Sequence, residues 1–152
     1  MPTTVELEVT NRLLDKLRAH DANEDALLNA YRSLANADPD DGIRYLAGLI
    51  AEDEERHHRL LAEMAERVET WRRAEGDESG TPHLSPRIDR ALLETTRQLI
   101  KSEREDAKEL RRLRRELHNA GGASLLPLMV ELMLRDTAKH IEILRFIRTY
   151  TG

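Results

Sequence analysis

The stretch Leu49-Ile-Ala-Glu-Asp-Glu-Glu-Arg-His57 is matched without a gap by Leu132-Met-Leu-Arg-Asp-Thr-Ala-Lys-His140. Both copies begin with apolar residues and end in a histidine. Each copy lies in a long segment whose apolar residues return every three or four positions, which is the period of an α-helix. The repetition is consistent with an internal duplication, so the chain is expected to contain two related halves.

The composition favours long helices in a single domain. Of the 152 residues, 35% are charged and only 3% are aromatic, and a chain of this length can bury one core. There is no cysteine, so any bound metal must have oxygen and imidazole ligands. A net charge of -5 argues against a nucleic-acid partner. No signal sequence and no apolar run of roughly 20 residues is present, so the sequence predicts no membrane association and a cytoplasmic location.

Turn and cap signals divide the chain into four predicted helices, at about residues 5–36, 39–74, 86–119 and 124–149. The last three start at a capping residue followed by a first-turn proline, with the caps at Asp38, Ser85 and Ser124. Short turns should make antiparallel pairs of the first two and of the last two helices. The segment 73–85 is long enough to cross the length of a helix. We therefore expect an all-α four-helix bundle of two hairpins joined by a long crossover.

Acids and histidines interrupt the apolar stripe of each predicted helix. The six residues are Glu24, Glu54, His57, Glu103, Asp136 and His140. Buried carboxylates without a partner cost several kcal/mol, on the order of their desolvation penalty, so these groups require pairing. Spacings of three and four residues place each acid and histidine of the second and fourth helices on one face. All six groups could meet at one level, and such a set suits two iron or manganese ions, with zinc chemically possible.

On these residues the chain resembles the ferritin-like superfamily, and within it the rubrerythrin-type bundles. The segment 53–57 resembles the family's second-helix motif, and Glu24 with Tyr31 resembles its first-helix signature. The fourth helix departs from the family, because Thr137 stands where the family has a glutamate and Asp136 must substitute for it. The chain also lacks the four-cysteine rubredoxin-like domain. The resemblance implies a di-iron or di-manganese carboxylate protein, an oxidoreductase of ferroxidase or peroxidase type acting on iron, oxygen or peroxide.

Other interpretations stay open at this stage. If the fourth-helix site is degenerate, the bundle could bind one ion or none. A bundle that binds none would be a metal-free scaffold or protein-interaction module. A hemerythrin-like bundle needs more histidines than the predicted stripes supply, and ranks lower. His58 is expected on a flank of its helix, and His20 at a hydrogen bond near the bundle end rather than in support of Glu24. A homodimer is the expected assembly.

Overall fold

The computed structural model describes residues 4–73, 87–118 and 124–151, and every regular element in these ranges is a helix. The elements are α1 (Thr4–Ala37), α2 (Asp41–Arg73), α3 (Arg90–Leu117) and α4 (Leu126–Thr151). The predicted all-α, four-helix fold is therefore confirmed. None of the helices in the described ranges combines the length and apolar character required to cross a bilayer. Of the predicted crossover, 73–85, only Arg73 is described, as the last residue of α2, and the rest lies outside the described residues, as does the glycine turn at 121–122.

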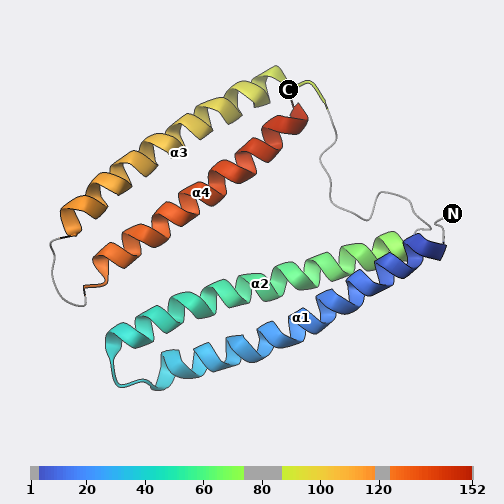
Figure 1. The fold of residues 1–152 in the computed structure, drawn as a ribbon, viewed down its shortest axis with the longest axis horizontal. Coiled ribbons are helices and arrows are strands. Elements are labelled where there is room, and N and C mark those ends of the chain that lie inside the picture. Colours follow the sequence, from blue (N-terminus) through green and yellow to red (C-terminus); the bar gives the residue numbers. More distant parts are fainter. Residues whose placement is uncertain (1–3, 74–86, 119–123, 152) are drawn as a thin grey trace. The chain divides into compact units, whose positions relative to one another are not determined.

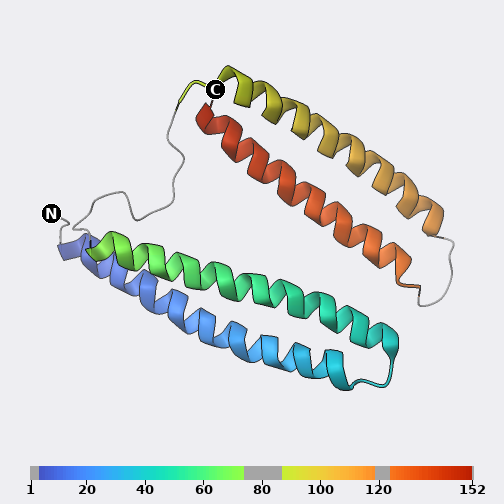
Figure 2. The same cartoon turned by 180° about the vertical axis from the view of Figure 1, so that it is seen from behind.

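The helices pack in two pairs. The first hairpin consists of α1 and α2, and the second hairpin consists of α3 and α4. In both views the two helices of each pair run antiparallel and side by side (Figures 1 and 2). The chain divides into two compact units at residues 82 and 83, and each unit contains one hairpin. The sequence prediction of two antiparallel pairs is confirmed.

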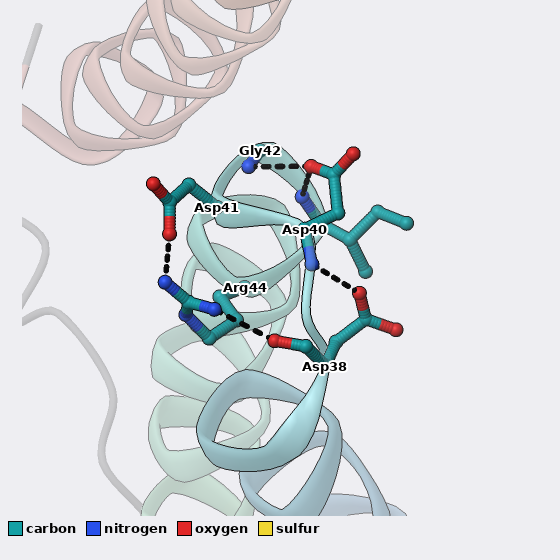
Figure 3. Close-up of polar contacts among 6 residues, drawn as sticks. Asp38, Asp40, Asp41, Gly42 and Arg44 are labelled. Carbon is teal, nitrogen blue, oxygen red and sulfur yellow. Dashed lines mark hydrogen bonds and ion pairs between the residues drawn. The ribbon is translucent and has the colours of Figure 1, made fainter.

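Two aspartates fix the turn between α1 and α2. The carboxylate of Asp38 accepts a hydrogen bond of 2.8 Å from the backbone N–H of Asp40. Asp40 in turn caps α2, because its Oδ1 accepts from the N–H groups of Gly42 at 2.7 Å and Ile43 at 3.1 Å. Arg44 donates to the Asp38 carbonyl at 2.7 Å (Figure 3). The prediction of Asp38 as the cap is wrong, because its side chain closes the turn and α2 starts later, after Asp40.

The starts of α3 and α4 also depend on side-chain caps. Asp89 caps α3, since its side chain accepts from the N–H of Leu92 at 2.9 Å. The helix therefore begins at Arg90 rather than at residue 86, and the predicted cap Ser85 lies outside the described residues. At α4 the prediction is close, because the Ser124 hydroxyl accepts from the N–H of Leu126 at 3.4 Å.

Each hairpin buries a narrow apolar seam between its helices. The buried apolar residues of the first hairpin are Leu14, Leu17, Leu28, Ala47 and Ala51, and those of the second are Ile100, Ala107, Leu110 and Val130. Many large residues of the predicted apolar stripes lie outside these seams and are exposed, among them Leu13, Leu27, Ile43, Ile50, Leu99, Leu128, Leu132 and Ile143. The helices of one hairpin thus cover only part of the apolar surface that the sequence provides.

Candidate metal centre

Three of the six predicted ligands come together in the first hairpin. Glu24 extends from α1, and Glu54 and His57 extend from α2. One ligand atom from each residue lies within 4.8 Å of the other two. The Nδ1 atom of His57 is 3.7 Å from Oε2 of Glu54 and 3.9 Å from Oε2 of Glu24. Across the described residues, this is the group of three or more acids and histidines whose ligand atoms converge.

Of the two carboxylates of this cluster, Glu24 is buried and Glu54 is half-buried, and both are incompletely paired. Glu24 is 8% exposed, and the Glu54 side chain is 15% exposed. The Oε2 atoms of both residues are inaccessible to solvent and have no hydrogen-bond partner within the described ranges. A buried acceptor without a partner is costly and calls for an explanation. A bound cation contacting both oxygens would supply one.

The pKa of Glu54 reflects this crowding. The neighbouring Glu24 raises the pKa of Glu54 above its ordinary value, because a protonated Glu54 can share its proton with the Glu24 carboxylate. Burial and repulsion between the two negative charges act in the same direction. His57 opposes the shift, mainly through its charge, across the 3.7 Å that separates its Nδ1 from Oε2 of Glu54. The site therefore favours a positive charge, either a proton or a metal ion, between its two carboxylates.

Two further histidines, His20 and His58, contact acids of α1 next to the cluster. Nε2 of His20 lies 3.1 Å from Oε1 of Glu24, which leaves the other oxygen of Glu24 turned toward the cluster. Partners of this kind orient metal-binding carboxylates in proteins. The expectation that His20 does not support Glu24 is therefore wrong. Nδ1 of His58 lies 2.8 Å from Oδ1 of Asp21, across the same pair of helices. His58 was predicted on a flank of its helix, and its pairing with Asp21 was not predicted.

The donor set fits a divalent transition-metal ion. Bonds of about 2.0–2.2 Å to one ion place neighbouring donor atoms roughly 3 Å apart or slightly more. The separations of 3.7 and 3.9 Å from the imidazole nitrogen to the carboxylate oxygens therefore need only a small contraction. Two carboxylates and one imidazole are ligands that suit iron, manganese and zinc. Together the two carboxylates also balance the charge of a divalent ion.

In the second hairpin the predicted ligands form only a pair. Nδ1 of His140 lies 3.3 Å from Oε1 of Glu103, with 50% and 28% of these side chains exposed. The Asp136 side chain is 60% exposed, and its Oδ1 lies 2.7 Å from Nζ of Lys139 on the same helix. The inward position belongs to Thr137, which is 4% exposed. The convergence of all six groups on two ions concerns both hairpins together and stays a prediction.

Comparison of the chain with protein-family models, curated sequences and solved structures finds no match. The ferritin-like resemblance thus rests on the motifs of the chain itself and stays a prediction.

Proposed function

We propose that the protein is a metal-binding protein of ferritin-like type, which holds iron or manganese at Glu24, Glu54 and His57. The supporting observation is the pair of buried Oε2 atoms that have no hydrogen-bond partner in the described ranges and lie beside an imidazole nitrogen. An ion between them would neutralise both charges.

In this proposal each residue has a distinct role. Glu24 and Glu54 bind the ion through their buried oxygens, and His57 adds the nitrogen. His20 is a positioning residue, because it contacts the outer oxygen of Glu24 at 3.1 Å. The imidazole of His57 is 47% exposed, so the ion would be accessible to a small molecule from one side. A bound iron or manganese ion supplies one-electron chemistry with oxygen or peroxide, and this chemistry is the proposed activity.

Metal binding is tested first by equilibrium dialysis with Mn²⁺, and with Fe²⁺ under anaerobic conditions. The wild-type protein should bind, and Glu54→Gln should weaken binding at least about 10- to 100-fold, the range seen even for outer partners of metal ligands. Glu55→Gln is the matched control, because Glu55 is the next residue on α2, pairs with Arg32 and has a side chain that is 52% exposed. A wild-type protein that binds neither ion, or equal losses in the two variants, would overturn the proposal.

The oxidative activity is tested separately. Ferrous iron is added to the protein in the presence of oxygen or of peroxide, and the appearance of ferric iron is followed by absorbance. The wild-type rate should exceed that of Glu54→Gln, while Glu55→Gln should retain the wild-type rate. Binding without any difference in these rates would limit the function to metal binding.

A second candidate function is a helical interaction module. It is favoured by the large apolar residues that neither hairpin covers with its own helices, such as Leu27, Ile50 and Ile143. A second copy of the chain is the partner expected from the sequence. Sedimentation velocity of the metal-free protein tests this candidate, because a monomer at all concentrations would count against self-association, whereas a dimer that survives Glu54→Gln would favour it.

A further inference from the structure

The two hairpins bury corresponding positions. In the gapless match between α2 and α4, Ala47 corresponds to Val130, and both are buried. In the same match Glu54 corresponds to Thr137, and His57 corresponds to His140. The corresponding faces of α2 and α4 therefore pack against their partner helices, as the sequence repeat suggests.

The partner helices continue this correspondence. Glu24 on α1 contacts His57 at 3.9 Å, and Glu103 on α3 contacts His140 at 3.3 Å. One turn beyond each glutamate, Leu28 and Ala107 are buried in the respective seams. Both hairpins thus bring a glutamate of the first helix, one turn before a buried apolar residue, to a histidine of the second helix.

The hairpins differ at the position of the second carboxylate. Thr137 is 4% exposed, and its hydroxyl donates to the backbone carbonyl of Met133 at 3.1 Å. The hydroxyl also lies 3.5 Å from Oδ2 of Asp106 on α3. Thr137 therefore faces α3 at the place where Glu54 faces α1. A neutral hydroxyl that is already hydrogen-bonded cannot replace a carboxylate as a metal ligand.

We infer that the second hairpin contains a latent divalent-cation site that lacks one carboxylate, and that Thr137 occupies the place of the missing ligand. This inference rests on the proposed function of the first hairpin. It has two consequences: the native chain binds its metal in the first hairpin only, and a carboxylate at position 137 creates a second site with Glu103 and His140.

The experiment uses Mn²⁺ binding by the full chain, measured by equilibrium dialysis. Thr137→Glu should about double the Mn²⁺ bound per chain, and the added binding should disappear with His140→Ala but not with His57→Ala. The reciprocal variant, Glu54→Thr with Thr137→Glu, should bind Mn²⁺ only in the second hairpin. Thr137→Gln is the matched control, because it has the size of glutamate without the charge.

Folding is checked by circular dichroism and thermal melting. Should Thr137→Glu fail to fold, Thr137→Asp has nearly the size of threonine and tests the same site. Folded variants with a carboxylate at 137 and no added binding would overturn the inference. It would also fail if Glu54→Thr alone kept wild-type binding and His140→Ala removed it. A wild-type protein that binds no Mn²⁺ refutes the proposed function and, with it, the first consequence, whereas the gain or lack of gain in binding on Thr137→Glu still decides the second.

Discussion

The first and second hairpins are similar in their backbone arrangement and different in their chemistry. Both place a glutamate opposite a histidine across two antiparallel helices. The first adds Glu54 between them and leaves two buried oxygens without a hydrogen-bond partner in the described ranges. The second has Thr137, whose hydroxyl is satisfied by its own helix. One inward position, Glu54 or Thr137, thus distinguishes the hairpin in which three potential ligands converge from the hairpin that has only a histidine–glutamate contact.

The largest expected effect is the loss of stability when a core leucine of either hairpin is truncated, and Mn²⁺ binding should then distinguish the two hairpins. Leu28→Ala and Leu110→Ala each remove a large side chain that is 3% or 6% exposed, and each should cost about 2–5 kcal/mol of unfolding free energy. Only Leu28→Ala should also weaken Mn²⁺ binding, because Leu28 lies one turn from Glu24. Urea denaturation and equilibrium dialysis measure the two quantities. Equal losses of Mn²⁺ affinity in both variants would contradict the assignment of the site to one hairpin.

A smaller effect is expected at the helix caps. Asp40→Ala and Asp89→Ala each remove a carboxylate that accepts backbone N–H groups at a helix start, and each should cost about 1 kcal/mol. Asp40 also determines how α2 leaves the turn, so its loss should lower Mn²⁺ affinity, while the loss of Asp89 should not. Asp40→Asn keeps an acceptor oxygen and should restore most of the stability. Wild-type affinity in Asp40→Ala would show that the turn does not set the ligand positions.

The smallest expected effect is a pH dependence of the folding stability of the metal-free protein, which arises from the first hairpin. The pKa of Glu54 is raised in the folded state, so the folded protein binds its proton more tightly than the unfolded chain does. The resulting stabilisation is complete below the ordinary glutamate pKa of about 4.3 and is lost as the pH rises through the folded-state value. His57 partly opposes the shift, which keeps the effect small.

Denaturation of metal-free wild type and Glu54→Gln at several pH values measures this contribution. The glutamine variant should gain stability relative to wild type between acidic and neutral pH, because it has no proton to lose. The matched variant Glu55→Gln should show no such relative change. If the wild type instead gained stability relative to Glu54→Gln toward neutral pH, the carboxylate of Glu54 would be stabilised, not destabilised, by its surroundings.

Much of the fold could be predicted because its signals are local. Apolar period, short turns and capping residues gave the four helices and their pairing. The start of α3 was misplaced because Asp89, unlike the predicted cap, has no proline after it to mark it, yet its carboxylate reaches the N–H of Leu92. The crossover and the assembly of the hairpins into one bundle stay predictions.

The site was predictable where ligands share one helix turn. Glu54 and His57 are three residues apart, so any helix places them on one face. The sequence could not show whether Asp136 or Thr137 takes the inward position, because this depends on which of them faces α3. In the structure Thr137 faces Asp106 on α3. The pair of Asp21 and His58 was missed for the same reason, since it depends on the register between α1 and α2.

The turn at residues 38–40 also bears on how a cation would be captured. Two aspartates and Arg44 hold this short connection, and the fold itself brings the donors on α1 and α2 close together. Little loop-closure entropy is then left to oppose coordination. Association should accordingly proceed with a single rapid phase whose rate rises linearly with cation concentration, without a preceding slow rearrangement of the chain.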